Sequence, residues 1–177
     1  MKRHFLFAVF FCTFLYGFSQ EWKWQNPLPQ GNTLLDVHAF SPGRMIAVGE
    51  AGTIIETIDS GQTWKVHESG SSFQLNSVYF RDSITGWAVG AFGRILHTKN
   101  GGKNWFKQQE RVKTSLHSVY FIDNQTGWAV GEGGVILSTK NGGEKWTFQN
   151  NGPRESLESV YFLNKKLVKA PPKLVSF

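Results

Sequence analysis

A stretch of about 41 residues occurs several times in register along this chain, and this repetition limits the possible fold more than any other feature. The two clearest copies begin at Ser77 and Ser118. Each reads Ser-Val-Tyr-Phe, then Thr-Gly-Trp-Ala-Val-Gly, then Asn-Gly-Gly-x-x-Trp. A looser copy precedes them, and a fourth opens at residues 159–162 and then loses the pattern. A period of this length is typical of stacked structural repeats, in which each repeat packs against its neighbours.

Each copy predicts four short strands rather than helices. β-Branched and aromatic runs alternate at period two between Gly and Asn clusters, and no long run has the helical period of 3.6. Four strands in about 41 residues is the size of one β-propeller blade. We therefore predict an all-β fold of propeller-type blades of four antiparallel strands, about three of them complete, with partial first and last strands. Trp87 and Trp128 are expected to fill the contacts between blades.

The predicted organisation follows the repeats. A signal peptide occupies residues 1–19, and Asp-box propeller repeats occupy residues 20–163. The repeat region divides into an outer strand at 22–35, three blades at 36–76, 77–117 and 118–158, and a partial blade at 159–163. A divergent basic tail follows at 164–177.

The tail breaks the pattern, because Pro171-Pro172 stands where the second strand of a fourth blade is expected. Two interpretations follow. One is a truncated or frameshifted reading frame, and such a gene fragment would have no function. The other is a natural short arc that closes by self-association through its open blade edges.

The first nineteen residues have the features of a secretory signal. A basic start at Lys2-Arg3 precedes an apolar run from Phe5 to Tyr16, and Ser19 ends a small-residue cleavage site. The run is too short to span a bilayer comfortably, so we expect no stable membrane span after cleavage. The single cysteine, Cys12, lies inside this segment. The mature chain therefore has no disulfides, and we expect a bacterial protein exported to the periplasm or the exterior.

The formal net charge of +6 comes from the two ends of the chain. Residues 20–163 carry 13 basic and 13 acidic side chains, and the excess lies in the signal peptide and in the tail. Nucleic-acid binding needs positive charge clustered on the folded body, so we expect no nucleic-acid partner.

The turn before the fourth strand carries the most specific motif. Residues 57–64 fit Ser/Thr-x-Asp-x-Gly-x-x-Trp, which resembles the Asp-box of bacterial neuraminidase repeats, and two later copies carry Asn for Asp. Asp or Asn accepts N–H groups of its own turn, and Gly supplies a positive φ. Because Asn cannot act as a general acid or base, we predict a structural role. The structural Asp-box positions are Thr57, Asp59, Gly61, Trp64, Thr98, Asn100, Gly102, Trp105, Thr139, Asn141, Gly143 and Trp146.

With these motifs in fixed order, the chain resembles the photosystem II stability/assembly factor family of exported β-propellers over about residues 22–162. The family also has members in non-photosynthetic bacteria, and we expect a truncated member of that kind. Photosynthetic members assist membrane-complex assembly and bind protein partners through a basic, Arg-rich surface. The resemblance therefore implies a non-catalytic binding or assembly scaffold with a protein or glycan ligand. Arg44, Arg81 and Arg94 break the repeat consensus and are the candidate binding residues; ordinary solvated arginines are the alternative.

No catalytic residue, metal site or cofactor is predicted. The histidines of the mature chain occupy different repeat positions without zinc-site spacing, and there is no nucleophile elbow or phosphate loop. Sialidases also carry Asp-boxes, so a sialidase-like glycan hydrolase is the alternative function. They resemble one another further in a Phe/Tyr-Arg-Ile-Pro motif and an arginine triad. The nearest match is Gly93-Arg94-Ile95-Leu96, so we expect no enzymatic activity.

Overall fold

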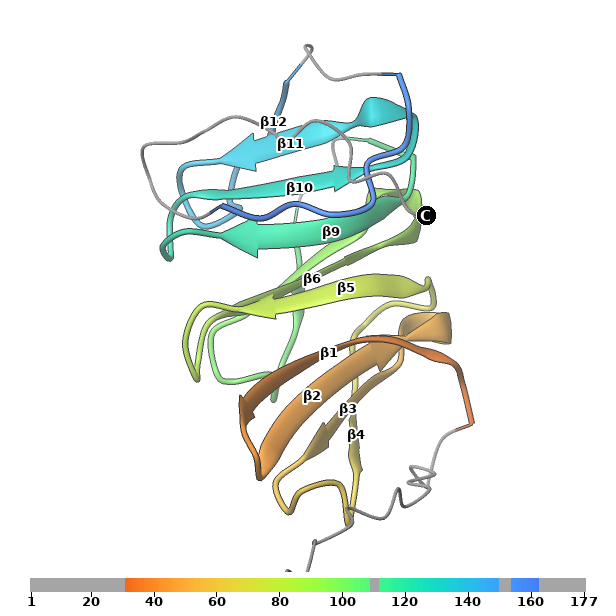
Figure 1. The fold of residues 1–177 in the computed structure, drawn as a ribbon, viewed down its shortest axis with the longest axis vertical. Coiled ribbons are helices and arrows are strands. Elements are labelled where there is room, and N and C mark those ends of the chain that lie inside the picture. The colour runs from red at the N-terminus through yellow and green to blue at the C-terminus, as the bar shows by residue number, and fades with distance from the viewer. Residues whose placement is uncertain (1–30, 109–111, 150–153, 163–177) are drawn as a thin grey trace, which may run out of the picture.

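The computed structural model describes residues 31–108, 112–149 and 154–162, and over these it contains three four-stranded antiparallel sheets (Figure 1). In each sheet the strands follow one another in chain order. Blade 1 consists of β1 (Leu34–Ser41), β2 (Arg44–Gly49), β3 (Ile54–Thr57) and β4 (Lys65–His67). Blade 2 consists of β5 (Leu75–Phe80), β6 (Gly86–Gly90), β7 (Ile95–Thr98) and β8 (Phe106–Lys107). Blade 3 consists of β9 (Leu116–Phe121), β10 (Gly127–Gly131), β11 (Ile136–Thr139) and β12 (Thr147–Phe148).

The predicted all-β fold of propeller-type blades is confirmed. The second and third strands of each blade are joined by a short 3₁₀ turn: η1 (Glu50–Gly52), η2 (Ala91–Gly93) or η3 (Glu132–Gly134). Within the described ranges, no helix is long and apolar enough to cross a membrane.

The first strand of each blade begins two residues before the predicted repeat. A glycine at the end of the second strand explains the longer pairing, as at Gly90, which pairs with Leu75 across a register shift. A Cβ at Gly90 would collide with the backbone carbonyl of Gln74. Because glycine has no Cβ, the incoming chain lies closely over the end of the second strand.

Several predictions about the ends fall outside the described residues. They include the signal peptide at 1–19, most of the outer strand at 22–35 and the basic tail at 164–177. Leu34 and Leu35, placed in that outer strand by the sequence, belong to β1 instead.

The segment 159–162 was expected to start a fourth blade, and it forms no regular strand. It nevertheless follows β9, because the N–H of Val160 donates to Ser118 Oγ at 3.2 Å and the Tyr120 hydroxyl donates to the Phe162 carbonyl at 3.2 Å. It therefore lies where the inner strand of a further blade would lie, without a strand ladder.

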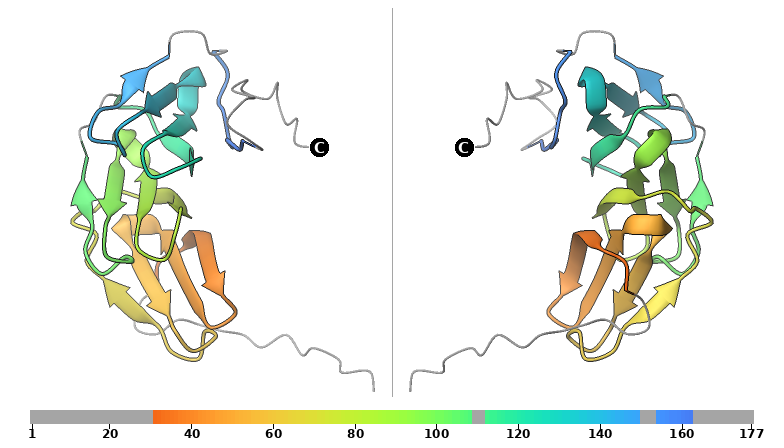
Figure 2. Two further views of the ribbon diagram at one scale, coloured as in Figure 1. Left: turned by 90° about the vertical axis from the view of Figure 1, so that its left-hand side faces the viewer. Right: turned by 90° about the vertical axis from the view of Figure 1, so that its right-hand side faces the viewer.

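The three blades stack into an arc. Figure 2 shows the first strands β1, β5 and β9 along the concave inner side and the fourth strands β4, β8 and β12 along the convex outer side. Apolar side chains fill the two joints between blades. The joint between blades 1 and 2 includes Ile46, Val48, Ile54, Val78, Phe80 and Trp105. The joint between blades 2 and 3 includes Trp87, Val89, Ile95, Val119, Phe121 and Trp146.

Both tryptophans expected at blade contacts are buried, Trp87 between blades 2 and 3 and Trp128 between blade 3 and the segment 159–162. Trp87 stacks on Phe121 with ring centroids 3.5 Å apart, and its indole N–H donates to the Gly142 carbonyl at 3.1 Å. Trp128 packs on Phe162 with centroids 4.2 Å apart. Burying one such ring stabilises the stack by roughly 4–6 kcal/mol before entropy costs. Each blade is thus stabilised by packing its apolar face against the neighbouring blade.

A row of aromatic rings spaced by 41 residues ties the inner strands together. The Tyr79 hydroxyl donates to the Phe121 carbonyl at 2.9 Å, so β5 is bound to β9. The rings of Tyr79 and Tyr120 lie 4.9 Å apart, and those of Tyr120 and Tyr161 lie 5.0 Å apart. Burial, reinforced by Tyr120, raises the pKa of Tyr79 to about 12. The Tyr79 hydroxyl therefore acts as a neutral donor between blades 2 and 3.

Candidate functional site

The three box turns (residues 57–64, 98–105 and 139–146) share one hydrogen-bond pattern. In each, the Thr hydroxyl accepts the N–H of the Gly four residues later, at 2.9, 3.0 and 2.9 Å. The Asp or Asn Oδ1 accepts the N–H four residues beyond itself at 2.9 Å in every case. This backbone bond is the same for Asp and Asn, so it requires a carbonyl-type oxygen rather than a charge. Asp59 alone adds a second bond, since its Oδ2 accepts the Thr63 hydroxyl at 2.6 Å.

The glycine and the Asp or Asn that recur in the three box turns complete this local structure. The glycines at 61, 102 and 143 have φ of 84°, 89° and 88°, a left-handed conformation that glycine adopts without steric cost. Hydrogen bonds from Thr63, and then from Thr57, hold the pKa of Asp59 below its ordinary value. The carboxylate is thus engaged within its own turn.

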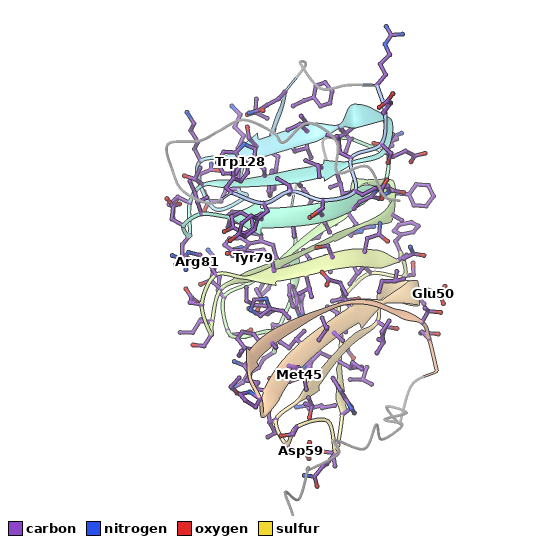
Figure 3. All side chains as sticks on the ribbon, in the orientation of Figure 1. Met45, Glu50, Asp59, Tyr79, Arg81 and Trp128 are labelled. Carbon is purple, nitrogen blue, oxygen red and sulfur yellow. The ribbon has the colours of Figure 1, made fainter. Side chains whose placement is uncertain are left out.

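The three candidate arginines do not gather on one surface. Arg81 is exposed and follows β5, where Figure 3 shows it at the opposite end of the blades from Glu50. Arg94 is buried, at 7% exposure, with its guanidinium carbon 5.0 Å above the Phe73 ring. That these arginines bind a partner stays a prediction, and the three side chains do not form a common patch.

Arg44 joins blade 1 to blade 2. Its Nε donates to Glu56 Oε1 at 2.9 Å within blade 1. Its two terminal nitrogens donate to backbone carbonyls of blade 2, those of Ser83 at 3.2 Å and Gly101 at 2.7 Å. The guanidinium also lies 4.1 Å over the ring of Phe40. With these bonds formed, Arg44 fixes how the two blades lie at the edge of their joint.

Beside Arg44 lies a hollow with a volume of about 850 Å³. We call it the first groove, and it runs between blades 1 and 2. Blade 1 contributes Glu56, Ile58, Trp64 and Lys65, and blade 2 contributes Ser83, Ile84, Lys99 and Lys103.

The Glu56 carboxylate in the lining of the first groove is held in place by two partners. The carboxylate of Glu56 is held from both sides, by Arg44 at one oxygen and by His67 Nε2 at the other, 2.9 Å away. His67 is itself 8% exposed. The negative charge of Glu56 is therefore already engaged by the protein, whereas the groove's lysines Lys65 and Lys103 are exposed.

The equivalent space between blades 2 and 3, here the second groove, consists of two adjoining hollows of about 280 and 520 Å³, and its lining differs from that of the first groove. Most of the residues that line the first groove have their repeat equivalents, 41 residues later in the chain, in the second groove. Arg44 becomes Thr85, Glu56 becomes His97, Ile58 becomes Lys99, Ile84 becomes Gln125 and Lys103 becomes Glu144. The two grooves therefore share a backbone and differ in chemistry.

His97 in the second groove is a neutral, stacked side chain. Its ring lies parallel to Trp87, with centroids 4.9 Å apart and planes 4° apart. Its Nε2 is buried and has no hydrogen-bond partner among the described residues. Burial, and then the charge of Lys99, lower the pKa of His97 to about 4. His97 is therefore uncharged at neutral pH.

Sequence reasoning missed the groove residues Ile58, Ile84, Lys65 and Lys103. Their departures from the repeat were visible, but they looked like ordinary surface variation between copies. No group of three or more His, Cys, Asp or Glu residues suited to a metal ion occurs in the described part of the chain.

Comparisons with known proteins place these features in a family. The family model described as photosynthesis system II assembly factor YCF48 matches residues 17–114, more than half of the 177-residue chain. A structure of YCF48 bound to D1 peptide is 30% identical with a TM-score of 0.61, and the match covers 70% of this chain and 42% of that one. YCF48 from Cyanidioschyzon merolae is 25% identical with a TM-score of 0.62, covering 75% and 43%.

Two further structures are similar in fold alone. The computationally designed Ika4 protein is 15% identical with a TM-score of 0.64, covering 78% of this chain and 85% of that one. An ancestral GH74 enzyme is 17% identical with a TM-score of 0.61, covering 81% and 22%. A comparison with curated proteins gave no match. The chain spans less than half the length of the YCF48 structures it matches. From its 41-residue repeats, its four-stranded blades and the match over residues 17–114, the chain belongs to the YCF48 family of photosystem II assembly factors.

Proposed function

We propose that this protein is an exported, non-catalytic scaffold that binds a segment of another protein, in the periplasm or outside a bacterial cell. The observation that carries the proposal is the 30% identity to YCF48 in a structure where that protein is bound to D1 peptide. A related stack of blades holds a peptide there, so peptide binding is the simplest function for this one.

The geometry supports binding in preference to chemistry. The Asp and Asn side chains of the box turns are used within their own turns. The hollows between blades are lined by polar, charged and apolar side chains from two neighbouring blades. Such a mixed lining suits a segment of protein chain, because a peptide offers polar backbone groups together with charged and apolar side chains.

A peptide array tests the binding function. The full chain is expressed with its own leader in a bacterial host, purified and applied to an array of diverse nine-residue peptides. We expect a subset of peptides to bind saturably, with dissociation constants of order micromolar, as for a small preformed site. Binding to no peptide above background would contradict the proposal.

Two further measurements test export and the absence of catalysis. Mass spectrometry of the purified protein is expected to find Gln20 as the first residue, since cleavage is predicted after Ser19. A fluorogenic sialoside is expected to remain intact. Retention of Met1 would contradict export by a cleaved leader, and enzyme-dependent turnover would favour the sialidase-like alternative.

A further inference from the structure

We propose that the first groove binds the partner's chain, and that it takes an extended acidic segment carrying an aliphatic side chain. This inference rests on the proposed protein-binding function and adds the place and the chemistry. The groove crosses the joint between blades 1 and 2, and its lining includes Arg44 but neither Arg81 nor Arg94. It therefore contains one of the three candidate arginines and not the combined surface predicted from them.

Two exposed isoleucines mark an aliphatic subsite. Ile58 on blade 1 and Ile84 on blade 2 are 75% and 55% exposed, and both line the first groove. The positions 41 residues later carry Lys99 and Gln125, which line the second groove. Single exposed apolar residues are ordinary. Two on opposite walls of one groove, with polar residues at both equivalent positions of the next, indicate a bound apolar group.

The charge at the first groove selects an acidic segment. Lys65, Lys99 and Lys103 line it, and all three are exposed. The acid in its lining, Glu56, already has both oxygens engaged by Arg44 and His67. Carboxylates of a bound segment would therefore meet cations, and a basic segment would be repelled.

The first groove is also preformed. Arg44 holds the two blades at a fixed separation through its bonds to Glu56, Ser83 and Gly101. An added Cβ at Gly101 would lie 2.9 Å from both the Arg44 side chain and the Ser83 carbonyl, so the wall is closely packed there. A rigid groove loses little entropy when a chain enters it.

The test measures fluorescence anisotropy of a labelled nine-residue peptide of Glu and Asp with a central Leu. Two comparison peptides replace the Leu with Ser, or the acids with Lys. The groove variants are Lys65→Glu/Lys103→Glu and Ile84→Gln, the latter introducing the residue type that the second groove has. Lys99 is left unchanged because it lines both grooves. The matched control is Lys140→Glu/Lys145→Glu, which reverses two charges on the box turn of blade 3.

We expect each groove variant to weaken binding of the acidic Leu peptide about tenfold, or about 1.4 kcal/mol, with unchanged thermal midpoints. The control double variant is expected to change it less than about twofold, consistent with a weak, screened contribution from distant charges. The Ser peptide is expected to bind about tenfold more weakly than the Leu peptide, and the Lys peptide not at all.

Several results would overturn the inference. Equal weakening by the control variant would mean non-specific attraction to positive charge. If peptides found on the array bind the groove variants as tightly as the wild type, the groove is not the site, while the binding function stands. If no peptide binds the wild type on the array either, the proposed function fails together with the inference.

Discussion

Single residues of the box turns act through shape and hydrogen bonding rather than charge. Asn100 and Asn141 accept the same backbone N–H bond as Asp59, at the same 2.9 Å. A carboxylate is therefore not needed for the backbone bond that closes the turn, although at Asp59 it also accepts the Thr63 hydroxyl. The threonine hydroxyl of the box, buried at Thr98, is present in all three copies.

Exchanging these residues tests that distinction. Thr98→Val is expected to destabilise the protein by about 1–3 kcal/mol, because the buried N–H of Gly102 loses its acceptor. Asp59→Asn keeps the backbone bond at Oδ1 but loses the acceptor of the exposed Thr63 hydroxyl, so a smaller loss at pH 7 is expected and this variant serves as the comparison. Urea unfolding followed by tryptophan fluorescence measures both, and a larger loss for Asp59→Asn than for Thr98→Val would contradict the account.

His97 makes the stability depend on pH. Its folded-state pKa is lowered to about 4 from an ordinary value of 6.5, so the unfolded chain takes up a proton first as the pH falls. Stability is therefore present above pH 6.5 and is lost progressively toward pH 4, by at most about 3 kcal/mol before solvent screening. His97→Phe keeps a ring against Trp87 and is expected to flatten this slope in urea titrations.

A second histidine supplies the comparison. Burial lowers the pKa of His38 as well, opposed by Asp36, so a smaller slope of the same sign is expected to remain in His97→Phe. An unchanged slope in that variant would show that His97 does not control the pH dependence.

At the scale of the element, the 3₁₀ turns joining the second and third strands use one backbone conformation with three different residues. The central residue is Ala51, Phe92 or Gly133, with φ of 52°, 56° and 68°. A left-handed conformation costs a residue with a Cβ roughly 1–2 kcal/mol and costs glycine little. The turn therefore imposes strain in blades 1 and 2 that blade 3 avoids.

A reciprocal pair of variants measures that strain. Ala51→Gly is expected to stabilise the protein by about 1 kcal/mol. Gly133→Ala is expected to destabilise it by a similar amount, because an added Cβ at Gly133 meets no atom within 4 Å and adds only backbone strain. Thermal unfolding of both proteins is the measurement, and shifts of the same sign would rule out strain as the cause.

At the scale of the whole molecule, the arc is a chain of joints between neighbouring blades. In such a stack each joint stabilises the two blades it connects, and distant blades are affected weakly. The joint between blades 1 and 2 is bridged by Arg44, and the joint between blades 2 and 3 by the indole of Trp87.

Removing one bridge is therefore expected to act locally. Arg44→Ala loses its bonds to blade 2 and is expected to weaken the first joint by roughly 2 kcal/mol. Hydrogen exchange is expected to accelerate in blade 1 and to stay unchanged in blade 3. Arg81→Ala, which removes an exposed side chain, is the control. Uniform acceleration across all three blades would contradict a stack of separable joints.

The sequence by itself determined the blades and their turns. Alternating apolar residues and glycine-bounded turns repeat every 41 residues, and both act between residues close in the chain. The box turn likewise closes through bonds between residues at most four apart, as from Gly61 to Thr57. Such local features are readable because the interacting groups are separated by a few bonds.

Only the tertiary structure decided which side chains from different blades meet. Ile58 and Ile84 belong to separate repeats, and they share a groove because blade 2 stacks on blade 1. Arg44 reaches carbonyls 39 and 57 residues away, a role that its own repeat position does not indicate. The early start of each first strand also depends on a close approach to a glycine in the next strand. These contacts arise from blade packing, which joins residues that no local pattern relates.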